Sequence, residues 1–181
     1  MSQEVVDRVT HLLHQFDARV QAAPADSWSN QSPCSEWKAR DVVAHVGNNL
    51  RRLTAGMSGS APSEIGSDEE IGAAWNSSLH DFLTGLGTAD LSAEIPGPMG
   101  PMAMEHMIGR FVCNDILVHT WDLARSVGGD EQLDPAAVAG AYEGLKPMDA
   151  MIRRPGVFAD KIERDGVDLQ TEFLAFLGRT V

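Results

Sequence analysis

Residues 111–128, FVCNDILVHTWDLARSVG, are the stretch of sequence that decides the fold. Their apolar side chains recur with the period of an α-helix, so one side of this segment is expected to face a core. At about 100° per residue, Asp115 and His119 lie roughly 40° apart on that side, with Asp122 close to them. The same stripe continues toward the N-terminus through Met104, Ile108, Phe111 and Val112.

Three polar residues therefore interrupt a stripe that otherwise faces a core. Buried charges without partners are costly, so such residues need a metal, a catalytic partner or a hydrogen-bonded network. The alternative is an ordinary i, i+4 pair on a helix surface, which stabilises a helix only slightly. The apolar surroundings of Asp115 and His119 favour the metal interpretation.

The rest of the chain also reads as helices, because no segment of comparable length alternates like a strand. Ser67 and Glu70 have the spacing of a capping box, Asp134 and Pro135 are typical of a helix start, and Gly128 is typical of a helix end. The sequence thus predicts an all-α fold: a four-helix bundle with an extra helix and a short irregular C-terminal segment. Residues 1–181 are expected to form a single domain. The expected helices span about 3–21, 39–55, 67–86, 102–127 and 135–151, with a closing helix at 169–177.

Composition excludes several classes of partner. The chain has 181 residues, 43% of them hydrophobic, and a formal net charge of -12, which opposes binding to nucleic acid or to an anionic membrane. No segment is long enough to cross a membrane and the N-terminus lacks the apolar core of a signal peptide, so we expect a cytoplasmic protein. Cys34 and Cys113 are too few for a disulfide framework and are expected to be reduced thiols with packing roles.

A divalent metal needs a third protein ligand besides Asp115 and His119. His45 is the best candidate, because it lies mid-helix at the margin of an apolar face in the helix expected to pack beside 102–127. Asp122 either orients the His119 ring or holds a metal-bound water. The alternatives are a local ion pair with Arg125 and a contact with the N-terminal end of another helix. No nucleophile lies beside a base, so the catalytic residues remain unknown.

Three motifs resemble those of a known family. SPCSEWKARDVVAHV, residues 32–46, resembles the "PC, W, then DVVAH" segment of mycothiol-dependent maleylpyruvate isomerase-like proteins, members of the DinB/YfiT-like superfamily of metalloenzymes. VHTWDLARSVGGDEQLD, residues 118–134, resembles the same family's "vHtWDLA" segment, and LAFLGR, residues 174–179, is similar to the C-terminal signature of a short actinobacterial branch. From the first to the last, these motifs span residues 32–179, which is most of the chain.

The resemblance implies a DinB-like four-helix bundle that holds a divalent metal, commonly zinc, with nickel as a second candidate. It implies ligands at His45, Asp115 and His119, the same residues that the helix pattern indicates. The family carries Glu where this chain has Asp115, which shortens the carboxylate arm by one methylene.

The sequence leaves three functions open. The first is a metal-dependent transferase or isomerase that uses mycothiol or a similar low-molecular-weight thiol to attack a small electrophilic molecule. The second is a non-catalytic metal- or small-molecule-binding protein of a stress response, and the third is a metal-dependent hydrolase with water as the nucleophile. Bundles of this kind often pair through an exposed helix face, so a homodimer is one expected assembly.

Overall fold

The computed structural model describes residues 2–97, 100–153, 158–164 and 166–181, which fall into two compact units, Met1–Asp130 and Glu131–Val181. Its secondary structure is almost entirely helical, which confirms the all-α prediction. That the whole of 1–181 is a single domain stays a prediction. Among the residues described, no helix combines the length and the apolar character needed to cross a membrane.

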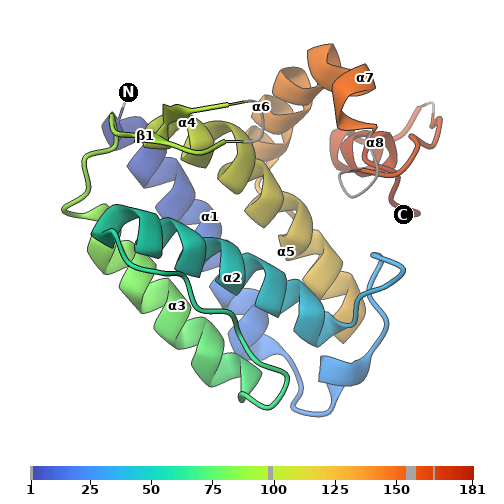
Figure 1. Ribbon diagram of the computed structural model, residues 1–181. Helices are drawn as coiled ribbons and strands as arrows, with labels where there is room; N and C mark the ends of the chain where they lie inside the picture. Colours follow the sequence, from blue (N-terminus) through green and yellow to red (C-terminus); the bar gives the residue numbers. More distant parts are fainter. Residues whose placement is uncertain (1, 98–99, 154–157, 165) are drawn as a thin grey trace. The chain divides into compact units, whose positions relative to one another are not determined.

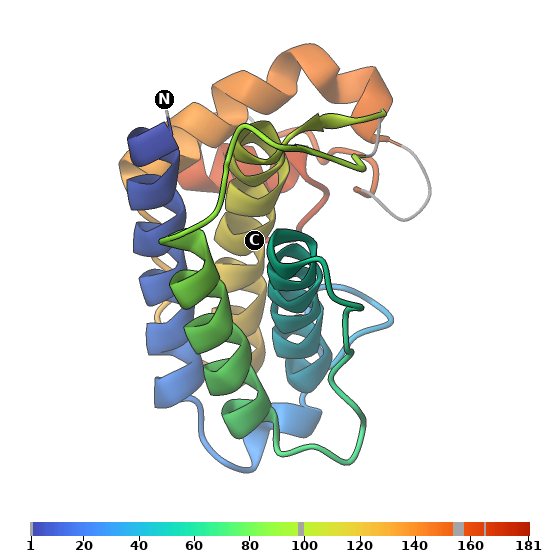
Figure 2. The ribbon, with the colours of Figure 1, turned by 60° about the vertical axis from the view of Figure 1, so that its left-hand side comes forward.

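The first unit is built around four long helices, α1 (Ser2–Ala22), α2 (Ala39–Ser58), α3 (Ile71–Leu86) and α5 (Cys113–Val127). The helices α1 and α2 each pack against both α3 and α5, which closes a bundle of the expected DinB-like kind (Figures 1 and 2). A short 3-10 turn, η1 (Ser27–Ser29), lies in the connection from α1 to α2.

The core of this bundle follows from the helical spacing of its apolar residues. Side chains three or four positions apart share one helix face, and burying that face against the neighbouring helices stabilises the bundle far more than helix propensity does. The Phe16 ring lies 4.8 Å from the Trp75 ring, and the Trp75 indole N–H donates to Asp17 at 2.9 Å. The fully buried core side chains include Val9, Leu13, Phe16, Val42, Val46, Leu50, Trp75, Phe82, Ile116 and Leu123.

The start of α3 differs from the expected capping box at Ser67. The helix begins at Ile71, and the Glu70 carboxylate caps it by accepting hydrogen bonds from Gly72 N at 2.9 Å and Ala73 N at 2.6 Å. The Glu69 carboxylate instead accepts a hydrogen bond from Gly66 N, which closes a turn in the preceding loop. The loop therefore uses the residues that were expected to form the first helical turn.

The helix expected at 102–127 consists of several pieces. Residues Met102–Ala103 (β2) pair antiparallel with Glu94–Ile95 (β1), and the helical backbone then runs through α4 (Met104–Met107), a π turn η2 (Ile108–Val112) and α5. The π turn adds a residue to one turn. Val112, expected in the core, is buried, whereas Phe111, also expected there, is only half-buried. Residues 98 and 99 of the expected connection lie outside the described part of the chain.

The second unit contains α6 (Pro135–Leu145), a 3-10 turn η3 (Lys146–Met148), α7 (Asp149–Ile152) and α8 (Leu169–Phe176). Asp134 caps α6 by accepting a hydrogen bond from Ala137 N at 2.8 Å, as predicted. The helix expected over 135–151 breaks after Leu145 because Pro147 has no N–H and disfavours helical backbone before it. Tyr142 packs its ring against Phe173 and Phe176 of α8.

Candidate metal centre

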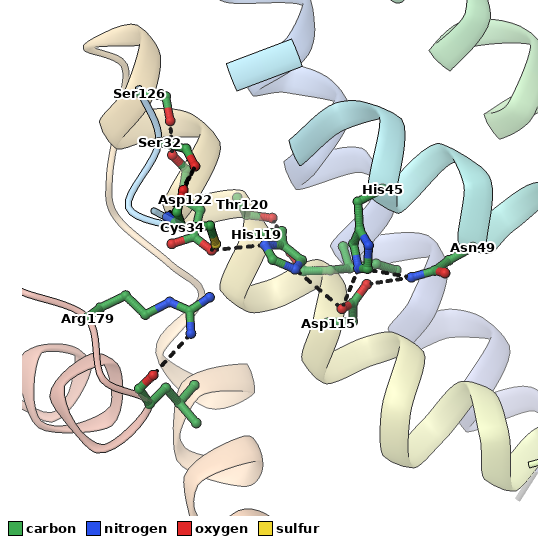
Figure 3. Close-up of polar contacts among 12 residues, drawn as sticks. Ser32, Cys34, His45, Asn49, Asp115, His119, Thr120, Asp122, Ser126 and Arg179 are labelled. Carbon is green, nitrogen blue, oxygen red and sulfur yellow. Dashed lines mark hydrogen bonds and ion pairs between the residues drawn. The ribbon is translucent and has the colours of Figure 1, made fainter. Parts of the chain in front are cut away.

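Two facing helices of the first unit bring three potential ligands together. His45 lies on α2, and Asp115 and His119 lie on α5, where the i, i+4 spacing directs both side chains toward α2 (Figure 3). The Asp115 Oδ1 atom is 3.1 Å from His45 Nε2 and 3.4 Å from His119 Nε2. The structure thus places the three residues selected from the sequence at one point; their binding of a metal stays a prediction.

The donor set and its spacing suit a divalent metal. Two imidazole nitrogens and one carboxylate oxygen are ligands that zinc accepts, with bonds of about 2.0–2.2 Å. Tetrahedral bonds of that length separate neighbouring ligand atoms by about 3.3–3.6 Å. The ligand atoms of His45, Asp115 and His119 all lie within 4.8 Å of one another, so small side-chain adjustments would accommodate an ion.

Asp122 lies behind His119, on the side of the imidazole away from Asp115. Its side chain is fully buried, and its Oδ2 atom is 2.9 Å from His119 Nδ1. A carboxylate at this distance keeps a proton on Nδ1, so loss of the other ring proton to an incoming ion would leave the Nε2 lone pair on the Asp115 side. Of the roles that the sequence leaves open for Asp122, the observed contact supports orientation of the ring.

The charges of Asp115 and His119 are tightly coupled to each other. Burial alone would raise the pKa of Asp115 and lower that of His119, because it disfavours both charged forms. The attraction between the two side chains and their hydrogen bonds outweighs burial, so the pKa of Asp115 falls below its usual value and that of His119 rises above its usual value. Both shifts favour the charged forms of the two side chains, so an ion that takes Nε2 would displace a proton from His119.

Asn49 contacts this centre and was not selected from the sequence. Its Nδ2 atom donates to Asp115 Oδ2 at 3.0 Å and lies 3.2 Å from His45 Nε2. Arg52 Nη1 donates to Asn49 Oδ1 at 3.0 Å, which fixes the amide with its NH₂ group toward Asp115. Its place near the centre could have been predicted from the i, i+4 spacing of His45 and Asn49, which puts both on one face of α2.

Two further residues come from the loop before α2. The Trp37 ring lies 4.7 Å from the His45 ring and 5.5 Å from the His119 ring, and Cys34 Sγ lies 3.5 Å from Asp122 Oδ2. The sequence predicts only a packing role for Cys34 and marks Trp37 only as part of a motif. Both occur in the motif of residues 32–46, which was the only signal of their place beside the centre.

Backbone contacts hold this loop in place. Gln31 Nε2 donates to Cys34 O at 3.2 Å and to Trp37 O at 2.8 Å, so one amide side chain braces both residues. Asn30 Nδ2 donates to Ser126 O at 3.0 Å, which fastens the loop to α5. Cys34 and Trp37 are thereby fixed relative to the helix that carries Asp115 and His119.

Comparisons with known proteins place the chain in a family. The mycothiol maleylpyruvate isomerase N-terminal domain matches residues 9–124, a range that includes α2, most of α5 and every residue of the centre. The uncharacterized proteins MT0763 and Rv0738 of Mycobacterium tuberculosis are each 32% identical to this chain over 177 residues, covering 92% of the chain and 92% of the relative. No solved structure gives a significant match. The extent of the domain match and of these two similarities shows that the chain belongs to the family of the mycothiol maleylpyruvate isomerase N-terminal domain.

Proposed function

We propose that this protein binds a divalent metal and uses it, with mycothiol or a similar low-molecular-weight thiol, to transform a small electrophilic molecule as a transferase or isomerase. The observation that supports the metal is the convergence of the His45 and His119 ring nitrogens on the Asp115 carboxylate, at 3.1 and 3.4 Å. Membership of a mycothiol-related family supports the thiol. Zinc is the first candidate ion and nickel the second, since imidazole suits both.

When bound, the ion would lower the pKa of a coordinated thiol and make its thiolate available as a nucleophile. His45 and His119 would hold the ion through Nε2 and Asp115 through Oδ1. Three protein ligands are the number that catalytic zinc sites use, which leaves a position for a substrate.

Neighbouring residues orient the side chains of these ligands. Asp122 accepts the Nδ1 proton of His119, so the Nε2 lone pair is directed toward the ion. Asn49 donates to Asp115 Oδ2, so Oδ1 is the carboxylate atom left for the ion. The Trp37 ring lies beside both imidazoles, at 4.7 Å from His45 and 5.5 Å from His119, and would offer an apolar surface to a small substrate.

Metal binding is tested first. Purified protein is stripped with a chelator, and zinc or nickel is added while the melting temperature and the bound metal are measured. We expect one ion per chain and a higher melting temperature, with the zinc affinity and the gain in melting temperature both reduced in His45→Ala. The matched control is His14→Ala, because His14 is an exposed histidine of α1 outside the centre. Absence of bound metal in the wild type under all these conditions would refute the proposal.

Thiol dependence is tested next. The metal-loaded protein is incubated with a panel of small electrophiles in the presence and absence of mycothiol, and product formation is followed by mass spectrometry. Turnover that requires both metal and thiol supports the proposal. Turnover without thiol favours a metal-dependent hydrolase, and inactivity of the loaded protein throughout favours the non-catalytic binding role. A cytoplasmic location and a homodimer stay predictions, the second tested by analytical ultracentrifugation.

A further inference from the structure

The His119 ring has a second set of potential ligands on its other side. Its Nδ1 atom is 2.9 Å from Asp122 Oδ2, which in turn is 3.5 Å from Cys34 Sγ (Figure 3). These three ligand atoms lie within 4.8 Å of one another, as do those of His45, Asp115 and His119. The imidazole of His119 is therefore shared by two clusters, one at each ring nitrogen.

The second cluster differs from the first in its chemistry. It contains a thiol, which as thiolate is the protein ligand preferred by soft metal ions, whereas the first cluster offers only nitrogen and oxygen. Bonds of about 2.3 Å to sulfur and 2.1 Å to oxygen place tetrahedral ligands about 3.6 Å apart. The Cys34 Sγ to Asp122 Oδ2 distance of 3.5 Å agrees with that separation.

Burial and access also favour a site. The Asp122 side chain is fully buried and that of His119 is nearly so, whereas Cys34 is only half-buried. An ion could therefore approach the cluster from the side of Cys34. The Asp122 carboxylate it would meet is already desolvated by burial. The bracing of residues 34 and 37 by Gln31 keeps the thiol beside α5.

From this geometry we propose that Cys34, His119 and Asp122 form a second cation site, for a thiophilic divalent ion, which excludes the ion of the His45, Asp115 and His119 centre. The exclusion follows from the shared ring, because a neutral imidazole has one lone pair for a metal and keeps a proton on the other nitrogen. An ion on Nδ1 requires the proton on Nε2, and the Cys34 thiol proton passes to the solvent. The exclusion, but not the site itself, rests on the proposed function of the first centre.

The consequence would be a switch that soft ions operate. A thiophilic ion at Cys34 turns the Nε2 atom of His119 into a hydrogen-bond donor and so removes one of the first centre's ligands. The proposed metal-dependent activity would then fall as the second site fills.

Cadmium tests the site directly, since a cadmium–thiolate bond has an ultraviolet charge-transfer band. The stripped protein is titrated anaerobically with Cd²⁺, without added thiols. We expect the band at one equivalent in the wild type and its loss in Cys34→Ala. Cys113→Ala is the matched control, because the chain's other cysteine is buried and away from the cluster, and it should keep the band. His45→Ala removes a ligand of the first centre only and should also keep the band.

Exclusion is tested by adding Cd²⁺ to the zinc-loaded wild type and counting both metals after gel filtration. One ion per chain in total, with zinc released as the band grows, supports the proposal. Two ions per chain together with the band would overturn the exclusion. A band that persists in Cys34→Ala, or disappears in His45→Ala, would overturn the second site. Failure of zinc to bind the wild type while the Cys34-dependent band forms would instead refute the proposed function and leave the second site standing.

Discussion

Replacement of Asp122 by asparagine removes one negative charge from a fully buried position while leaving the shape of the side chain nearly unchanged. The asparagine oxygen can still accept the Nδ1 proton of His119, so the effect on metal binding should come from the lost charge. A hydrogen bond to a charged group contributes about 1.5–3 kcal/mol and a neutral one about 0.5–1.5 kcal/mol. The difference, about 1–1.5 kcal/mol, corresponds to roughly a tenfold change in affinity.

We therefore expect Asp122→Asn to raise the dissociation constant for zinc by about tenfold, the lower end of the range typical of outer partners of metal-bound histidines. The assay is competition with a chromophoric chelator, on protein whose melting curve confirms that the metal-free variant is folded. Asp7→Asn serves as a control, since it makes the same charge change at an exposed position of α1. A dissociation constant within twofold of wild type would refute the orienting role of Asp122. A loss of zinc affinity as large as in His45→Ala would show that Asp122 is itself a ligand.

Three further predictions concern other parts of the molecule. Asn49→Ala should weaken zinc binding by at least about tenfold without changing the number of ions bound, because Asp115 loses the donor at its Oδ2 atom; an unchanged affinity in the same chelator assay would contradict this role. Tyr142 is the chain's single tyrosine, and burial together with its hydrogen bond to Glu172 raises its pKa from 10.0 to about 12. The stability that this protonated phenol contributes is thus complete below about pH 10 and is lost as the pH rises through about 12. An absorbance titration should show the raised midpoint in the wild type and a midpoint shifted toward 10 in Glu172→Gln. A wild-type midpoint already at 10 would contradict this prediction. Phe16→Ala should lower the free energy of unfolding by about 3–5 kcal/mol in denaturant titrations, because it empties a fully buried position; a loss below about 1 kcal/mol would show that the core collapses around the gap.

Features with a regular period were predictable from the sequence. The stripe of α1 and the pairing of Asp115 with His119 depend on the 3.6-residue repeat of one helix, which any helical segment obeys. His45 was predictable as their partner because it lies at the edge of an apolar face, and such an edge adjoins a neighbouring helix.

Features that depend on tertiary contacts of a loop were not predictable. Cys34 reaches Asp122 because the loop of residues 31–38 is fastened to α5 through Asn30 and Ser126, and no period in the sequence marks that contact. The break of the fourth expected helix was missed for a similar reason. Gly109 lies in the π turn, where its carbonyl accepts a hydrogen bond from Arg8 Nη2 at 3.0 Å and where an added Cβ would come within 2.9 Å of the same atom.

The π turn at Ile108–Val112 gives the long helical segment two independent angular settings. An extra residue in one turn rotates everything after it by about 100° relative to an unbroken α-helix. The rotation of α4 about the helix axis can therefore be set by its packing near β1 and β2. The rotation of α5 is set separately and directs Asp115 and His119 toward α2. Deleting one residue within 108–112 would remove this freedom: a single uninterrupted helix could satisfy the packing of α4 or the aim of the two ligands, but not both.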